Sequence, residues 1–127
     1  MNGEKRYFLD TNALVAFGNG DKAIGDLLAD ADGVFTSVVC ELEYLSWEGL
    51  TEEDERHFKL FLSMINVIDV SSPDMVLKSR VVEIRRMNKK IKLPDAIVMA
   101  SAAVTRSVLL TRDRQLVNAG ICEAREF

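Results

Sequence analysis

The 127-residue chain is poor in histidine and cysteine, and these shortages exclude several kinds of catalytic site. His57 is the only histidine, which rules out a metal-free ribonuclease built on two histidines. It lies in the charged segment 52–59, as expected for a solvated helix face, so a Ser-His-Asp hydrolase is also disfavoured. Cys40 and Cys122 each lie in an apolar context, which favours buried reduced thiols over a disulfide framework.

Long apolar runs and low-complexity segments are also missing. No apolar region follows the segment Met1–Arg6, so no signal peptide is expected, and no uncharged run is long enough to span a membrane. Together with reduced thiols, these absences favour the cytoplasm. Two prolines and seven glycines exclude a collagen-like or low-complexity chain. The length and the 48% hydrophobic content predict one domain, residues 1–127, with one core.

The chain has no overall basic excess, but its net charge of −4 conceals a split. Residues 1–64 carry 5 Lys/Arg against 13 Asp/Glu, whereas residues 65–127 carry 11 against 7. An acidic protein can still bind nucleic acid when its basic residues gather on one face, or when a bound dication offsets clustered carboxylates. The composition therefore leaves a nucleic-acid substrate open.

Short apolar runs alternate with helical patterns along the whole chain. Strands are expected at 6–9, 34–37, 67–70 and 108–111, with a possible fifth at 121–124; helices are expected at 11–17, 21–31, 38–48, from Thr51, from an N-cap at Ser72 followed by Pro73, at 95–105 and at 114–118. This alternation predicts an α/β fold, a three-layer α/β/α domain with a short parallel sheet of four to five strands.

Two carboxylates follow predicted strands directly. Asp10 comes after the first strand and Asp113 after the fourth. Crossovers of one hand bring the carboxyl ends of parallel strands to one edge, so the two acids face each other if these strands are neighbours. Each acid also has an ordinary explanation, because Asp10 and Asp113 could each cap the helix that follows.

Two further carboxylates lie beside apolar segments, where an unpaired charge is costly. Asp95 precedes an apolar helical run, and Glu41 interrupts the stretch that starts at Val38. Their ordinary explanations are a favourable first-turn position for Asp95 and a solvent-facing side chain for Glu41. Glu43 competes with Glu41, but two residues apart on a helix they point to nearly opposite sides. Because Glu41 shares its face with Val38 and Leu45, we expect Glu41 to point inward.

Four segments carry these acids in order. They are Phe8-Leu9-Asp10-Thr11-Asn12, Thr36-Ser37-Val38-Val39-Cys40-Glu41-Leu42, Leu93-Pro94-Asp95-Ala96-Ile97-Val98-Met99-Ala100 and Leu110-Thr111-Arg112-Asp113. Together they resemble the four signature segments of PIN-domain ribonucleases, and in particular of VapC-type toxins from prokaryotic toxin–antitoxin pairs. Each segment alone is weakly specific, whereas four in order over nearly the whole chain are a strong signal.

The resemblance implies a metal-dependent endoribonuclease that leaves a 5′-phosphate and a 3′-hydroxyl. It assigns catalysis and the binding of Mg²⁺ or Mn²⁺ to four acids: Asp10, Glu41, Asp95 and Asp113. It also implies that Asn12 and Thr111 orient these acids or a bound water. Hard divalent cations prefer such oxygen ligands.

The resemblance further implies an RNA substrate, an antitoxin partner and a homodimer, with no membrane association. The helical hairpin at residues 38–65 would help form the dimer and receive the antitoxin. Tyr44 and Trp47 in this hairpin belong either to the core or to a partner-binding groove. Many relatives have a glycine shortly after the second acid, where this chain has Tyr44 and Leu45.

Basic residues lie close to the acids in the sequence. Arg85, Arg86, Lys89 and Lys90 precede Asp95, and Arg112 precedes Asp113. They could draw phosphates toward the acids. Alternatively, residues 85–92 are a solvated helix end whose cations suit the carboxyl terminus of the helix.

Other classes of protein fit the sequence less well. A receiver domain would use Asp69 as phosphoacceptor and Thr111 as switch residue. It also needs an acidic pair after the first strand and a lysine after the last, and this chain has neither. A haloacid-dehalogenase-type phosphatase would need an aspartate where Asn12 lies. Two alternatives stay open: a housekeeping PIN nuclease of RNA processing, and a PIN module that binds RNA or protein without cutting.

Overall fold

The computed structural model describes residues 4–127. Residues 1–3, part of the amino-terminal stretch in which no signal peptide is expected, lie outside the described residues. The strands are β1 (Arg6–Leu9), β2 (Gly33–Ser37), β3 (Asn66–Ile68), β4 (Val108–Leu110) and β5 (Ala124–Arg125). The helices are α1 (Thr11–Gly18), α2 (Lys22–Ala29), α3 (Val38–Leu45), α4 (Glu52–Leu62), α5 (Met75–Met87), α6 (Leu93–Val104) and α7 (Arg114–Asn118).

The described strands form one parallel sheet in the order β3-β2-β1-β4-β5. β1 lies at its centre, where Tyr7 pairs with Val34 on one side and with Val108 on the other. The prediction that the first and fourth strands are neighbours is therefore confirmed. Because the strands are parallel, their carboxyl ends lie at one edge, and Asp10 follows the middle strand there.

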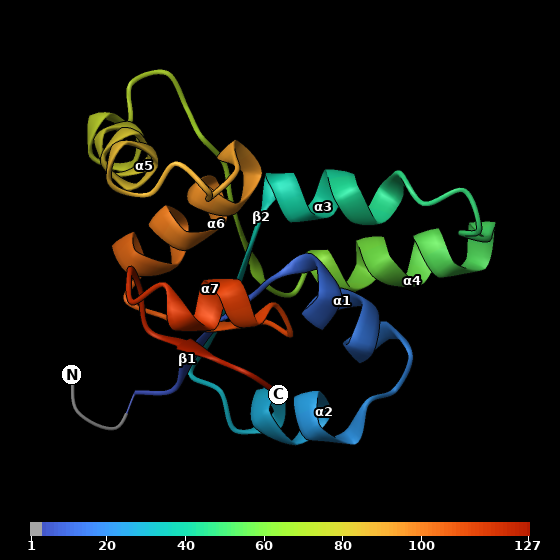
Figure 1. Cartoon of the computed structure of the whole chain (residues 1–127). Coiled ribbons are helices and arrows are strands. Elements are labelled where there is room, and N and C mark those ends of the chain that lie inside the picture. Colours follow the sequence, from blue (N-terminus) through green and yellow to red (C-terminus); the bar gives the residue numbers. More distant parts are fainter. Residues whose placement is uncertain (1–3) are drawn as a thin grey trace.

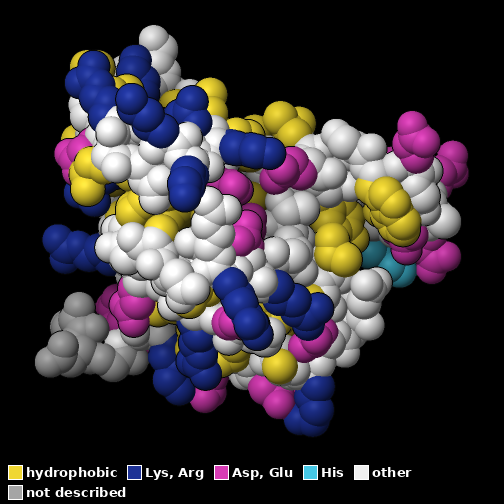
Figure 2. Space-filling model, viewed as in Figure 1, with side chains coloured by type: hydrophobic (Ala, Val, Ile, Leu, Met, Phe, Trp, Pro, Cys, Tyr) yellow, Lys and Arg dark blue, Asp and Glu magenta, His cyan; other side chains and the backbone are white. Residues whose placement is uncertain are grey.

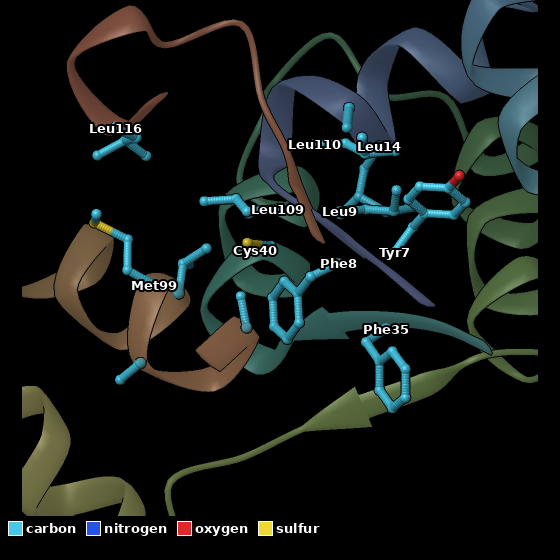
Figure 3. Packing of buried hydrophobic residues seen from close by; sticks show 14 of the residues in the cluster. Tyr7, Phe8, Leu9, Leu14, Phe35, Cys40, Met99, Leu109, Leu110 and Leu116 are labelled. Carbon is cyan, nitrogen blue, oxygen red and sulfur yellow. The ribbon is translucent and has the colours of Figure 1, made fainter. Parts of the chain in front are cut away.

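Side chains of the sheet alternate between the two helical layers. Figure 3 shows Phe8 on the side of Met99, which belongs to α6, whereas Tyr7 and Leu9 lie on the side of Leu14, which belongs to α1. These five side chains are buried. In Figure 1, α5 lies beside α6, and these two helices have extensive contact. The structure thus confirms the predicted α/β architecture with helices on both faces of a parallel sheet.

Helices α3 and α4 form a hairpin that extends away from the sheet (Figure 1). Tyr44 of α3 stacks on Phe58 of α4 with ring centroids 3.8 Å apart. Phe61 of α4 stacks on Phe17 of α1 at 4.6 Å, which ties the hairpin to the first helix. His57 has a side chain that is 70% exposed on the outer side of α4, as predicted for a solvated helix face.

One predicted helix start is wrong. The N-cap of α5 is Asp74, whose carboxylate accepts a hydrogen bond from the backbone N–H of Leu77 at 3.0 Å, and not Ser72. Aspartate at this position completes the cap, and Ser72-Pro73 becomes part of the preceding turn. Both cysteines are free, Cys40 buried and Cys122 partly buried. Within residues 4–127, no helix combines the length and apolar character that a membrane span requires.

Candidate functional site

Asp10 lies where β1 ends and α1 begins, and only 7% of the residue is exposed. Its Oδ1 accepts a hydrogen bond from the backbone N–H of Thr11 at 2.8 Å, so the predicted capping role is real. Its Oδ2 accepts a second one from the hydroxyl of Thr111, also at 2.8 Å. The Asp10 carboxylate is thus held from two sides, by the start of α1 and by the residue that follows β4.

Thr111 is the centre of a buried polar network that joins these strand ends. Besides donating to Asp10, its hydroxyl oxygen accepts from Asn12 Nδ2 at 3.3 Å and from the backbone N–H of Asp113 at 3.0 Å. The side-chain oxygen of Asn12 accepts from the backbone N–H of Arg112 at 3.1 Å. Asn12 and Thr111 therefore hold the loop after β4 against the loop after β1.

Asp95 and Asp113 each belong to the start of a helix. Asp95 is in the first turn of α6, and Asp113 caps α7 by accepting from the backbone N–H of Gln115 at 2.9 Å. Both positions are those that the ordinary explanations predicted. A carboxylate that caps a helix can still present an oxygen to the solvent side of the cap, so these roles do not remove the acids from a site.

A hollow of about 510 Å³ lies at this edge of the sheet, and we call it the acid hollow. It is lined by Asp10, Thr11, Asn12, Val15, Ala16, Asn19, Glu43, Asp95, Arg112 and Asp113. Figure 2 shows acidic side chains in the middle of this face, with Lys and Arg side chains around them. The structure therefore brings three of the four predicted acids, Asp10, Asp95 and Asp113, to one hollow.

The fourth carboxylate of the acid hollow is Glu43, and Glu41 does not line it. Glu43 Oε1 accepts a hydrogen bond from the hydroxyl of Thr11 at 2.7 Å. The geometry disagrees with the expectation that Glu41 points toward the other acids. The expectation for Glu41 assumed that the apolar face of α3 is also the face that meets the other acids. The face toward Asp10 instead contains Cys40, one turn before Glu43, and the Cys40 thiol lies 3.9 Å from Asp10 Oδ1.

The acids of the hollow influence one another's ionisation. Burial raises the pKa of Asp10 above its ordinary value, against the opposing effect of the hydrogen bonds from Thr111 and Thr11, and the charges of Glu43 and Asp113 raise it further. Burial also raises the pKa of Asp95, helped by the charges of Asp10, Asp113 and Glu43. Glu43 thus contributes to the electrostatics of both Asp10 and Asp95, which supports its place in the cluster.

The donor set of the acid hollow suits a hard divalent cation. Its four carboxylates, those of Asp10, Glu43, Asp95 and Asp113, supply only oxygen, the ligand type that Mg²⁺ and Mn²⁺ prefer. A dication would also counter the mutual repulsion that raises the pKa values of Asp10 and Asp95. Among residues 4–127, no three acidic, histidine or cysteine side chains are already drawn together tightly enough to coordinate one ion.

Arg112 is the one cation that lines the acid hollow among the described residues. Its guanidinium donates to Asp21 Oδ2 at 2.8 Å and lies over the ring of Phe127, 4.4 Å from the centroid. The basic residues near the end of α5 do not line the hollow. Arg85 instead donates to the carbonyl oxygen of Ile91 at 2.6 Å, which ties down the loop before α6.

The fold closely resembles those of several solved structures. A toxin–antitoxin complex from Klebsiella pneumoniae has a chain that is 28% identical, with a TM-score of 0.76, and the match covers 94% of this chain and 95% of that one. VapBC2 from Rickettsia felis, bound to a promoter DNA fragment, gives 19% identity and a TM-score of 0.78 over 96% and 98% of the two chains. VapBC-1 from nontypeable Haemophilus influenzae gives 18% identity and a TM-score of 0.74 over 95% of this chain and 97% of that one.

Comparison of the sequence with curated proteins gives no significant match. The family model of the PIN domain, in contrast, matches residues 7–121, from the first strand to the residues just before β5. This span contains every residue that lines the acid hollow, together with strands β2, β3 and β4 and nearly all of β1. The chain therefore belongs to the PIN-domain family.

Proposed function

We propose that this protein is a metal-dependent endoribonuclease and the toxin of a toxin–antitoxin pair, acting in the cytoplasm. The observation that carries the proposal is the convergence of Asp10, Glu43, Asp95 and Asp113 on one hollow at the carboxyl edge of a PIN-domain sheet. The similarity to a chain of a toxin–antitoxin complex from Klebsiella pneumoniae supports the biological role. An antitoxin and a second copy of the chain are its proposed partners.

The four carboxylates of the acid hollow would hold Mg²⁺ or Mn²⁺. When bound, such an ion lowers the pKa of a coordinated water and stabilises negative charge on a phosphate. Thr111 and the backbone N–H of Thr11 keep the Asp10 carboxylate in one orientation, so this ligand is already positioned and the other acids would move toward the ion. Arg112 adds a positive charge at the rim of the hollow that attracts the RNA phosphate.

The basic segment of α5 has a smaller part in this proposal than the sequence suggested. Arg85, Arg86, Lys89 and Lys90 lie outside the acid hollow, and Arg85 is engaged with the loop before α6. They would act on RNA beyond the cleaved bond, through charge alone. Arg112 is the basic residue that we place beside the reacting phosphate.

The test is cleavage of single-stranded RNA by the purified chain with Mg²⁺ or Mn²⁺ and with excess chelator. We expect cleavage only with the metal, and none by Asp10→Asn, which keeps the shape of the side chain but loses its charge. Cutting by that variant, or by wild type in chelator, would contradict the proposal. Sequencing of RNA ends after brief expression of both forms then identifies the cleaved sites.

The toxin role has a separate test. Expression of the wild type should arrest growth, whereas Asp10→Asn should not. Co-expression of a small protein encoded beside the gene should relieve the arrest and co-purify with the chain. Arrest that no neighbouring gene product relieves would favour the housekeeping nuclease instead.

A further inference from the structure

A second hollow, of about 440 Å³, lies between α1 and the α3–α4 hairpin, and we call it the aromatic pocket. Its walls are Val15 and Gly18 from α1, Tyr44 from α3, and Trp47 and Leu50 from the turn of the hairpin. In Figure 2, hydrophobic side chains are exposed over the hairpin, beside the central acidic side chains. The exposed apolar side chains of this pocket have no part in the proposed cleavage reaction.

The aromatic pocket adjoins the acid hollow. Four residues line both: Thr11, Val15, Asn19 and Glu43. Glu43 and Thr11, joined by their 2.7 Å hydrogen bond, form part of the shared wall. A polymer with one unit in the acid hollow would therefore reach the aromatic pocket with the next.

Trp47 presents an open aromatic surface in this pocket. Its residue is 64% exposed, an unusual state for the largest apolar side chain. The indole lies against Gly49, where an added Cβ would come within 2.5 Å of Cζ2 of the ring. Glycine at position 49 thus leaves room for the indole against this stretch of backbone, while much of the residue stays exposed.

The inner end of the pocket is shaped in a similar way. Tyr44 is held by its stack on Phe58, and a Cβ added at Gly18 would come within 3.1 Å of the Tyr44 hydroxyl oxygen. The bare backbone of Gly18 therefore lets the tyrosine approach α1. Two rings, Tyr44 and Trp47, are fixed in this way along one wall of a hollow that suits a flat ligand.

The polar groups of the pocket select for hydrogen-bond donors. Glu43 and Asp54 contribute carboxylates and Asn19 an amide, and no lysine or arginine is among the described residues that line it. Carboxylates accept hydrogen bonds from the exocyclic amino groups of nucleobases and repel phosphates. The pocket therefore fits a base with an amino group and does not fit a backbone phosphate.

We infer that the aromatic pocket binds one unpaired nucleobase of the RNA, stacked against Trp47, and that it prefers bases with an exocyclic amino group (adenine, cytosine and guanine) to uracil. The neighbouring phosphate then lies in the acid hollow, a placement that rests on the proposed function. Aromatic side chains commonly stack unpaired bases in this way. A nucleic acid fits both hollows at once, because its base can occupy the aromatic pocket while its phosphate meets a metal ion held by the neighbouring acids.

Trp47 is the only tryptophan in the chain, so its fluorescence reports on the pocket directly. The first measurement titrates wild type with oligo-A, oligo-C and oligo-U, with Ca²⁺ in place of Mg²⁺ so that the charge of the acids is offset. We expect saturable quenching, with tighter binding of oligo-A and oligo-C than of oligo-U. Absence of quenching by all three would overturn the inference.

Substitutions give a second, independent readout. Trp47→Ala should raise the KM for Mg²⁺-dependent RNA cleavage roughly 5- to 100-fold, the range that loss of one base stack produces, and more than it lowers kcat. Gly49→Ala retains the tryptophan but displaces its ring, so it should weaken quenching and raise KM as well. Leu60→Ala, at a 63% exposed residue of α4 outside the pocket, is the matched control and should behave as wild type.

The outcomes separate the pocket from the chemistry. Metal-dependent cleavage with an unchanged KM in Trp47→Ala would overturn the inference and leave the nuclease proposal standing. Quenching by oligonucleotides without any cleavage by wild type would support the pocket and contradict the proposed function. If Trp47 responds only to a co-purified antitoxin and not to RNA, the surface is a protein-binding site and the inference is wrong.

Discussion

Asp10 serves the fold and the site with the same carboxylate. One oxygen caps α1 through the backbone N–H of Thr11, and the other accepts from Thr111 on the adjacent strand end. These hydrogen bonds favour the ionised form, but burial and the nearby charges outweigh them and raise the pKa. The side chain is thus held ready for a cation at some cost to the metal-free fold.

The pH dependence of stability should reveal this cost. Because the folded-state pKa values of Asp10 and Asp95 are raised above 3.8, their stabilising contribution is complete below that pH and is lost as the pH rises through the raised values. In chelator, Asp10→Asn should therefore be more stable than wild type at neutral pH. The difference should shrink as the pH falls toward 3.8.

The measurement is urea unfolding of both proteins across this pH range, followed by far-ultraviolet circular dichroism. Mg²⁺ should reverse the order at neutral pH, since it stabilises the ionised wild type and has a weaker site in the variant. A larger advantage of Asp10→Asn at acid pH than at neutral pH would contradict the assigned direction of the shift.

Two neighbouring glutamates offer a matched comparison. Glu43 lines the acid hollow and Glu41 does not, although both belong to α3. Glu43→Gln should lower kcat/KM for RNA cleavage by at least about tenfold, because a carboxylate that holds or tunes the ion is lost. Glu41→Gln should cost clearly less. Both variants are measured folded and at saturating Mg²⁺. Equal losses of kcat/KM would show that lining the acid hollow does not distinguish the catalytic glutamate from its neighbour.

At the scale of secondary-structure elements, the α3–α4 hairpin depends on a small aromatic core. Phe58 is 5% exposed and stacks on Tyr44, whereas the neighbouring His57 faces solvent. Phe58→Ala should lower the free energy of unfolding by about 3–5 kcal/mol, as for other buried phenylalanines. His57→Ala should change it by less than about 0.5 kcal/mol. Chemical denaturation compares the two, and similar values would show that the hairpin is not anchored at this stack.

The elements also show how far sequence reasoning reaches. Asp10 and Asp113 could be located because each follows an apolar run that can only be a strand, and parallel strands end at one edge. Asp95 followed from its position before a buried helix. Local patterns fix such positions without knowledge of tertiary contacts.

Glu43 could not be found in the same way, because the face of α3 that meets the acids is set by packing. Periodicity identified the apolar face of the helix, but the acid hollow lies along a different face, where Cys40 contacts Asp10. The position of the Trp47 ring depends likewise on Gly49, two residues away, whose missing side chain leaves space for the ring. Both outcomes arise from three-dimensional contacts that a helical repeat does not encode.

At the scale of the whole molecule, the net charge of −4 should make RNA binding depend on divalent ions. Four carboxylates and only one cation, Arg112, line the acid hollow among the described residues. Without a metal, this surface repels the phosphate backbone. We therefore expect single-stranded RNA to bind weakly in chelator and more tightly with Ca²⁺, which carries the same charge as Mg²⁺ but binds with looser geometry.

Fluorescence anisotropy of a labelled RNA measures this effect. The control replaces Ca²⁺ with monovalent salt at the same ionic strength. Screening by salt alone should not reproduce the gain from Ca²⁺, because a bound ion neutralises the carboxylates locally. Equal affinities in chelator and in Ca²⁺ would show that the acids do not contribute to RNA binding.

The central position of β1 has a consequence for the nascent chain. Asp10 is among the first residues to be translated, but the hydroxyl that orients it belongs to Thr111, 101 residues later. Thr111 directly follows β4, the strand that pairs with β1. A ribosome must therefore synthesise most of the polypeptide before the carboxylates can assemble, so that a prematurely terminated product would lack the acid hollow.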